Sequence, residues 1–66
     1  MIREVLEKSS SHKSLVCVDV GNRREWCYVL RIWWDDMEDI VELKSKEGLR
    51  WQIALNEITG VELEVN

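Results

Sequence analysis

The first residues of the chain carry apolar side chains at helical spacing. Ile2, Val5 and Leu6 lie at positions i, i+3 and i+4, so they share one face of a helix. Charged residues occupy the other face. The polar stretch that follows has no hydrophobic period, which is typical of a linker. The pattern therefore predicts a helix over 1–9 and a linker over 10–14.

A helix this short is not stable alone in water, so it must pack against something. We expect its apolar stripe to cover one open end of a barrel formed by the strands that follow, against an aromatic side chain of the second strand such as Trp33. The alternative is a stripe that folds only on contact with a partner. Docking is the favoured interpretation, because the thin core of a 66-residue chain needs every apolar side chain.

From Leu15 onward the hydrophobic period changes to two, which is typical of half-buried strands. Gly21-Asn22 and Lys46-Glu47-Gly48 are turn sequences, and a tight turn of 3₁₀ form is expected at 56–58. In the last strand, Val65 is expected to face inward. The strands predicted between these turns are 15–20, 25–34, 40–45, 49–55 and 61–65.

The second of these strands is apolar on both faces. Strict alternation places Trp26 and Trp34 on one face, and Cys27, Val29 and Trp33 on the other. A long strand of this kind is most economically bent, so that its halves serve different parts of a closed sheet. Closure also removes the exposed edges of a small sheet.

The pattern therefore predicts one domain over 1–66. We expect it to be mostly β (α+β by count), with the short N-terminal helix followed by a five-stranded, strongly bent antiparallel barrel of SH3-like or Sm-like form over 15–65. No internal repeat and no second hydrophobic unit interrupts this pattern.

The segment DIVELKSKEGLRWQIALNEITGVEL, residues 39–63, pairs two strands across a short turn. It then makes an apolar-x-x-Ile step, Leu55-Asn56-Glu57-Ile58, into the final strand. In this respect 15–63 resembles the small Sm-like barrels of YolD-like proteins and, more loosely, WYL domains. The resemblance implies a regulatory or adaptor module of the kind carried by bacteria and phages.

The charge balance of the chain is acidic. Thirteen Asp and Glu residues oppose nine Lys and Arg residues, for a formal net charge of −4. Proteins that bind nucleic acid usually carry a basic patch, because neutralising phosphates supplies most of their non-specific affinity. Nucleic-acid binding by an Sm-like protein is thus an alternative hypothesis, and it would use a rim of Arg23, Arg24, Arg31 and Arg50. An acidic mimic of nucleic acid that blocks a basic partner is a further alternative.

The chain has two cysteines and one histidine. Cys17 and Cys27 lie on two strands of one hairpin, and they face each other if the turn holds three residues, 21–23. That arrangement permits a disulfide under oxidation, although free buried cysteines are commoner. A Cys-His nucleophile would need His12, which lies in the predicted linker, and a zinc site would need four ligands. We expect no catalytic residue, no metal site and no cofactor.

The N-terminal residues are charged where a secretory signal would be apolar, and no apolar run approaches the roughly 20 residues of a membrane span. We therefore expect a cytoplasmic protein with reduced thiols and no membrane partner. Whether the protein forms a homo-oligomer is left open by the sequence.

The most unusual stretch is Trp33-Trp34 followed by Asp35-Asp36. Adjacent strand residues point to opposite faces, so both tryptophans can pack, or one can be an exposed anchor for a partner. The acidic loop 35–39 lacks the spacing of a calcium loop and suits a solvated turn or a contact for a basic partner. Together with Arg31, these four residues form the candidate partner-binding site of a non-enzymatic protein-interaction or regulatory module, of the kind encoded by phages or other mobile elements.

Overall fold

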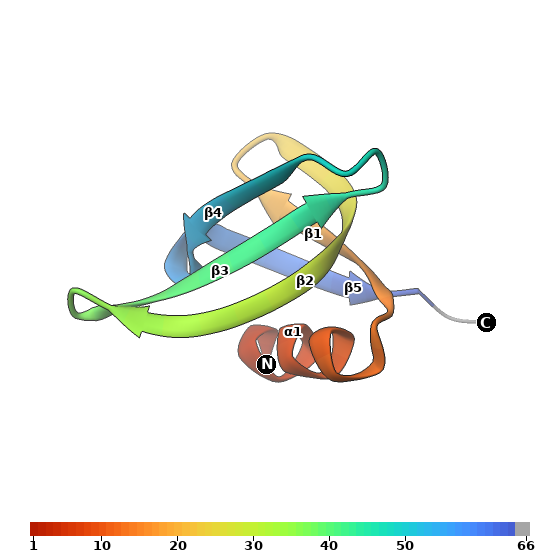
Figure 1. Ribbon diagram of the computed structural model, residues 1–66. Helices are drawn as coiled ribbons and strands as arrows, with labels where there is room; N and C mark the ends of the chain where they lie inside the picture. The colour runs from red at the N-terminus through yellow and green to blue at the C-terminus, as the bar shows by residue number, and fades with distance from the viewer. Residues whose placement is uncertain (65–66) are drawn as a thin grey trace.

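The computed structural model describes residues 1–64 as one helix packed against one antiparallel sheet (Figure 1). The strand order across the sheet is β4-β3-β2-β1-β5. The prediction of an N-terminal helix followed by five antiparallel strands is confirmed. In chain order the elements are α1 (Ile2–His12), β1 (Leu15–Val20), β2 (Arg23–Asp35), β3 (Glu38–Ser45), β4 (Arg50–Ala54), the 3₁₀ turn η1 (Leu55–Glu57) and β5 (Ile58–Leu63).

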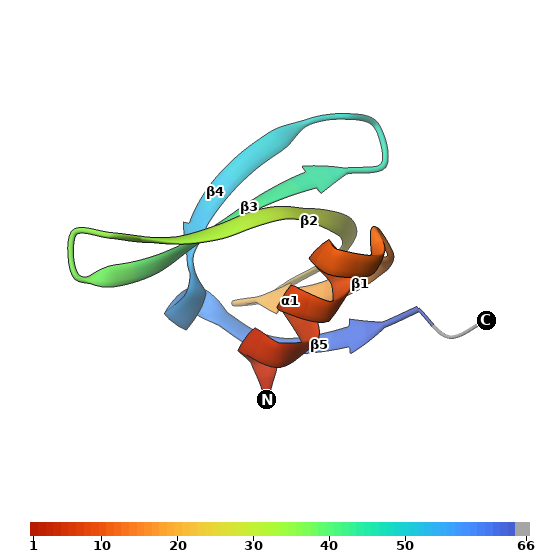
Figure 2. The same ribbon diagram turned by 60° about the horizontal axis from the view of Figure 1, so that its bottom comes forward.

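The sheet is open. β4 and β5 are its two outer strands, and no pairing joins them within residues 1–64. The prediction of a closed and strongly bent barrel is therefore wrong. The physical reason is that α1 lies over the inner face of the sheet (Figure 2). The apolar side chains of the helix and of this face bury one another, so burial does not require closure. Val65, which was expected to face inward, lies outside the described residues.

β2 serves both halves of the sheet, pairing with β1 along its first part and with β3 along its second. Its register against β3 passes from Val29–Leu43 to Arg31–Glu42 and leaves one extra residue, Leu30, without a partner on β3. An extra residue of this kind is a β-bulge, which bends the strand and reverses the alternation of faces beyond it. Ile32 consequently joins Val29 at the core, and the predicted strict alternation is wrong beyond the bulge.

α1 is longer than predicted, because the serine-rich stretch assigned to a linker over 10–14 completes its last turn. Lys13 takes the left-handed conformation with φ 54°, and the N–H of Ser14 donates to the carbonyl oxygen of Ser9 at 3.0 Å. This pattern is the Schellman motif, which satisfies the last carbonyl groups of a helix. Ser9 is buried, and its Oγ donates to the carbonyl oxygen of Ser14 at 2.7 Å. Serine is a weak helix former, so the sequence pattern does not predict this last turn of the helix, which only the tertiary contacts show.

The core lies between α1 and the inner face of the sheet. Leu6 of α1 is fully buried there, and Ile2 and Val5 pack beside it, so the prediction that the helix packs against the strands is confirmed. The predicted place is wrong, because the helix covers a face of an open sheet and not the end of a barrel. Trp33 is not its partner, because it lies on the other side of β2 from the core residue Ile32. The buried core residues are Leu6, Val16, Val18, Cys27, Val29, Val41, Leu43 and Ile58.

Arg3 fastens the beginning of α1 to β3, since its Nη1 lies 2.6 Å from Oδ2 of Asp39. This ion pair, together with the Arg3–Glu7 pair along the helix, raises the pKa of Arg3 above its ordinary value, with the hydrogen bond to Asp39 as the largest cause. Asp39 therefore belongs to β3 and to the helix contact, and is not part of a solvated loop as predicted.

We predict that Leu6→Ala destabilises the protein by about 2–5 kcal/mol, because it leaves a cavity where a fully buried side chain stood. A chain of this length has roughly 3–10 kcal/mol of stability in total. Urea unfolding followed by tryptophan fluorescence measures the loss, with the exposed Lys8→Ala as the matched control. Equal midpoints for the two variants would show that α1 does not hold the sheet.

Candidate functional site

A pocket opens where the inner face of the sheet is not covered by α1. The helix packs mainly on β2, β5 and β1, which leaves the inner face of β4 exposed toward the β1–β2 hairpin. The resulting cavity has a volume of about 520 Å³. Its apolar lining is Val18 and Val20 from β1, Leu49 from the β3–β4 turn, and Trp51 and Ile53 from β4.

Two tight turns bring these strands to the pocket. Gly21 has φ 59° in the two-residue β1–β2 turn, and Gly48 has φ 98° before β4, both in the left-handed region that glycine tolerates. Ser45 closes the second turn. Its N–H donates to the carbonyl oxygen of Leu49 at 2.8 Å, and its Oγ accepts from the N–H of Leu49 at 3.1 Å. Leu49 is thereby held at the pocket mouth.

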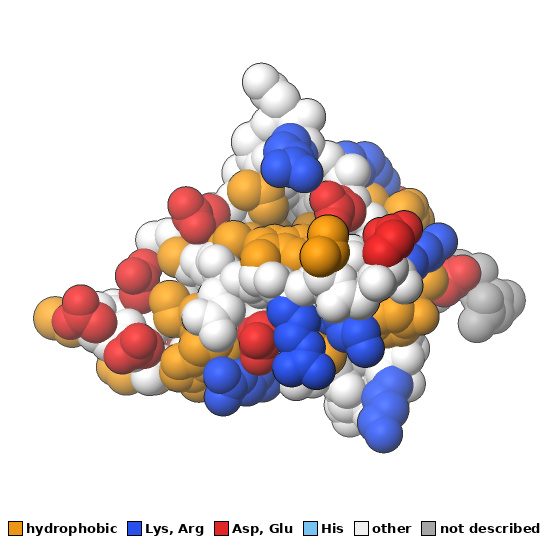
Figure 3. Space-filling view, turned by 45° about the horizontal axis from the view of Figure 1, so that its top comes forward, with side chains coloured by type: hydrophobic (Ala, Val, Ile, Leu, Met, Phe, Trp, Pro, Cys, Tyr) orange, Lys and Arg blue, Asp and Glu red, His pale blue; other side chains and the backbone are white. Residues whose placement is uncertain are grey.

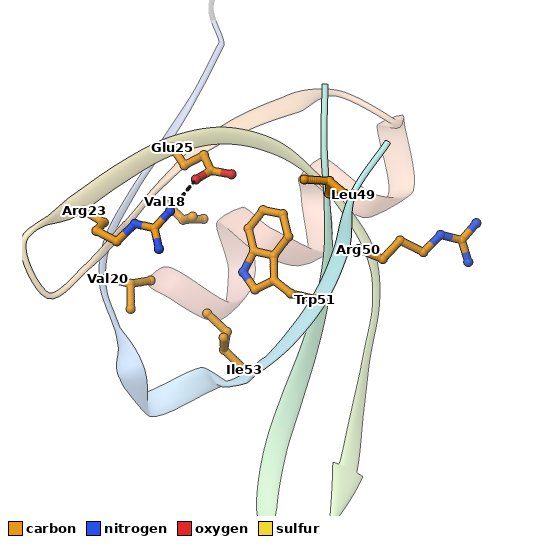
Figure 4. A pocket seen from close by; sticks show the side chains of 8 residues that line it. All are labelled: Val18, Val20, Arg23, Glu25, Leu49, Arg50, Trp51 and Ile53. Atoms are coloured by element: carbon orange, nitrogen blue, oxygen red, sulfur yellow. Dashed lines mark hydrogen bonds and ion pairs between the residues drawn. The ribbon is translucent and has the colours of Figure 1, made fainter. Parts of the chain in front are cut away.

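Trp51 forms the centre of the pocket wall. Its indole extends from β4 toward Val18 and Ile53, and it packs half-buried against the core (Figure 4). Leu49 stands beside it with 72% of its surface exposed. The sequence placed both residues on the inward face, which is the face they occupy, but it gave no sign that β4 would lack a covering layer.

Charged groups stand at the rim. Nη2 of Arg23 lies 3.5 Å from Oε1 of Glu25 on the β2 side of the cavity. Arg50 borders the cavity from the β4 side, with its guanidinium pointing away from Trp51 (Figure 4). Within residues 1–64, Arg50 makes no ion pair. The pocket is therefore apolar inside with one paired and one unpaired cation at its edge.

The four arginines of the predicted nucleic-acid rim do not all line the pocket. Only Arg23 and Arg50 border the pocket. Arg24 bridges two carboxylates, with Nη1 3.4 Å from Oδ1 of Asp19 and Nη2 2.7 Å from Oε1 of Glu62.

Arg31 is likewise paired with a carboxylate. Its Nε lies 3.0 Å from Oε1 of Glu42, and its guanidinium carbon lies 4.2 Å from the centroid of the Trp33 ring. Three of the four arginines thus have their charge offset by neighbouring carboxylates, which reduces the attraction they offer a phosphate backbone.

The other candidate residues lie on the β2–β3 hairpin, which projects from the body (Figure 1). The predicted acidic loop is only a two-residue turn, Asp36-Met37, because β2 extends to Asp35 and β3 begins at Glu38. Asp35 pairs directly with Glu38 across the strands, and like charges in such a pair are destabilising. Acidic side chains gather at this projecting end (Figure 3).

Trp33 and Trp34 separate at this hairpin. Trp33 is half-buried under Arg31, whereas Trp34 is 66% exposed, so the interpretation that both pack is wrong for Trp34. Asp36 and Met37 both have positive φ, 47° and 69°, in a turn without glycine. Strained, exposed turns of this type are retained more often at functional surfaces than elsewhere. The structure thus brings Trp34, Asp35 and Asp36 together and leaves Arg31 beside Trp33.

The two cysteines do not face each other. The β1–β2 turn has two residues, so Cys17 pairs with Trp26 and Cys27 pairs with Val16, and the two thiols lie on opposite faces of the sheet. Both are buried and free. Burial raises the pKa of Cys27 to about 12, with smaller effects from the charges of Glu25 and Cys17. This thiol is therefore held in the protonated form, which is a poor nucleophile.

The described part of the chain holds no cluster of three potential metal-ligating side chains, and none of its helices is long and apolar enough to cross a membrane. No protein-family model, curated protein or solved structure matches the chain. The resemblance to YolD-like and WYL proteins accordingly stays a prediction.

We predict that neither cysteine reacts with DTNB at pH 8 in the native protein, and that both react in urea. Burial excludes the reagent, and the raised pKa leaves Cys27 without thiolate at that pH. Because the folded pKa lies above the unfolded one, the free energy of unfolding falls as pH rises from about 9 to about 12. Rapid native labelling of a Cys17→Ala variant would contradict this placement of Cys27.

We further predict that Met37→Gly stabilises the protein by about 0.5–1 kcal/mol. A left-handed conformation costs an L-residue about 1–2 kcal/mol, and the added chain entropy of glycine offsets about half of the gain. Met37→Ala removes the same exposed side chain but keeps the strain, so it is the control. Equal urea midpoints for the two variants would show that the turn is not strained.

Proposed function

We propose that this protein is a non-enzymatic protein-interaction module whose pocket receives apolar side chains from an extended segment of a partner protein. The observation that carries the proposal is the solvent-open cavity of about 520 Å³, with Trp51 at its centre and Leu49 largely exposed at its mouth. Monomeric proteins rarely leave such apolar concavities unfilled unless something binds there.

The chemistry of the lining favours a protein segment over other ligands. Burial of one aliphatic side chain contributes about 1.5–3 kcal/mol, and tryptophan is enriched where partners bind tightly. Arg23 and Glu25 present opposite charges at the rim, which suits the mixed polar groups of a peptide. A cavity that buries two or three aliphatic side chains of a partner supports a reversible interaction, which is typical of a regulatory module.

The nucleic-acid hypothesis has less support. The net charge is −4, and Arg23, Arg24 and Arg31 each have a carboxylate partner. The acidic net charge and these carboxylate partners weaken the electrostatic contribution on which such binding depends.

A second candidate surface is the tip of the β2–β3 hairpin, for a basic partner. Trp34 and Met37 are exposed there beside Asp35 and Asp36, in a strained turn. This surface supports the hypothesis of an acidic mimic, because its carboxylates and exposed indole offer both charge and apolar contact to a basic site. It lies away from the pocket, so the two proposals can be separated by mutation.

We predict that peptides selected from a phage-displayed random library with the wild-type protein lose binding to Leu49→Asp and keep binding to Met37→Asp. The two substitutions are matched, because each places a carboxylate at an exposed apolar position and neither disturbs the core. Leu49 is 72% exposed and Met37 is 84% exposed. We expect the loss to exceed tenfold, because a charge in the pocket mouth must be desolvated on binding.

The opposite pattern, with binding lost in Met37→Asp alone, would transfer the function to the hairpin tip. Binding that survives both substitutions would contradict both surfaces. Fluorescence anisotropy with a labelled single-stranded oligonucleotide at low salt supplies the remaining control, and tight binding there would favour the nucleic-acid hypothesis instead.

A further inference from the structure

β4 is an outer strand of the sheet with one edge unpaired. Its other edge pairs with β3 in the register Lys44–Arg50, Leu43–Trp51, Glu42–Gln52, Val41–Ile53 and Ile40–Ala54. An unpaired edge offers backbone N–H and C=O groups to any strand that can lie beside it. Which groups these are follows from the hydrogen bonds at the two ends of β4.

At the first end of β4, the N–H of Ser45 donates to the carbonyl oxygen of Leu49 at 2.8 Å. Hydrogen-bonded and non-hydrogen-bonded pairs alternate along an antiparallel ladder. Trp51 and Ile53 therefore bond to β3, whereas the backbone groups of Arg50, Gln52 and Ala54 point to the free edge.

The other end of β4 agrees with this assignment. The N–H of Ala54 donates to Oε2 of Glu57 at 3.2 Å and so is turned away from β3. Arg50 and Gln52 are left as the two residues of β4 whose backbone N–H and C=O groups both face the unpaired edge.

The pocket reaches this edge. Trp51 and Ile53 line it with side chains on the inner face, and Arg50, whose side chain points the other way, borders the same cavity (Figure 4). A strand lying beside β4 would continue the sheet, so its inward side chains would fall next to Trp51 and Ile53. Main-chain pairing and pocket filling are thus available to one extended ligand at once.

We propose that the partner segment binds by adding an antiparallel strand to the free edge of β4, with two apolar side chains entering the pocket and an acidic side chain beside Arg50. This inference rests on the proposed function and specifies its ligand. Read from N to C, the segment has an apolar residue opposite Ile53, a polar one opposite Gln52, an apolar one opposite Trp51 and a carboxylate opposite Arg50.

Charge is what favours a partner segment over a second copy of this chain. Arg50 has no ion pair within the described residues, and its neighbour across the ladder is Lys44, another cation. Two copies of β4 paired about Gln52 would place Arg50 opposite Ala54 and leave its charge without a partner. A ligand that supplies a carboxylate at that position satisfies it.

The probe for the test is the fluorescein-labelled peptide SGTVTVETG, in which the two valines face the pocket and the glutamate meets Arg50. Anisotropy with the wild-type protein should show saturable binding. Gln52→Pro removes a backbone N–H that faces away from β3, so the fold tolerates it while strand addition does not. We expect affinity to fall about tenfold or more in Gln52→Pro, and to stay unchanged in Gln52→Ala, which keeps the N–H.

The peptide supplies a second measurement that does not depend on the stability of a variant. N-methylation of the threonine between the two valines removes the N–H that faces β4, and N-methylation of the valine that follows removes one that faces away. We expect only the first to abolish binding. The peptide SGTVTVKTG should bind about threefold or more weakly than the glutamate peptide, and Arg50→Ala should remove this difference.

The outcomes separate the two proposals. Binding that is lost in Leu49→Asp but retained in Gln52→Pro and with both methylated peptides keeps the pocket function and overturns strand addition. Absence of wild-type binding at millimolar peptide overturns the inference. A dimer of the free protein that Gln52→Pro dissociates also overturns it, because the edge would then belong to a second copy.

Discussion

The packing of α1 against the inner face of the sheet is the contact on which the rest of the structure depends. The five strands form an open sheet whose outer strands do not meet within residues 1–64, so the sheet cannot bury its inner face by closing on itself. Leu6 supplies the missing layer over β1, β2 and β5, and Arg3 fixes the beginning of the helix to Asp39. The helix covers only part of the face, and β4 is left with an apolar side open to solvent. The pocket is therefore a direct consequence of how a short helix covers a longer sheet.

The sequence pattern was sufficient for the order and type of the elements, because apolar periods of 3.6 and 2 follow local geometry. It was insufficient where one residue changed a register. The extra residue Leu30 returns Ile32 to the core and places Trp33 on the opposite face, and the two-residue turn at Gly21 moves Cys17 and Cys27 to opposite faces. Neither a bulge nor a turn length is determined by hydrophobic alternation. Whether the sheet closes into a barrel could not be predicted either. An inward-facing apolar residue gives the same sequence pattern whether a strand or a helix covers it.

The difference between local pattern and tertiary arrangement also explains which candidate sites could be found from the sequence. Trp34, Asp35 and Asp36 could be found from sequence because they are unusual in composition, and they do lie together at the exposed hairpin tip. The pocket residues Trp51 and Ile53 could not, since they are ordinary inward residues of a strand. What makes them a site is the missing cover over β4, which is a tertiary property. Leu49 was the one available signal, as an apolar residue directly after a glycine turn, where a solvated position usually carries a polar side chain.

If a partner segment lies in the pocket beside Trp51, as we propose, NMR can observe this contact directly. The four tryptophans give four indole N–H signals, of which those of Trp51 and Trp34 report on the pocket and on the hairpin tip. In a titration with SGTVTVETG, we expect the Trp51 indole signal to shift and nuclear Overhauser effects to join its ring to the valine methyl groups. A shift confined to the Trp34 signal, or methyl contacts that reach Trp34 and not Trp51, would contradict the proposal.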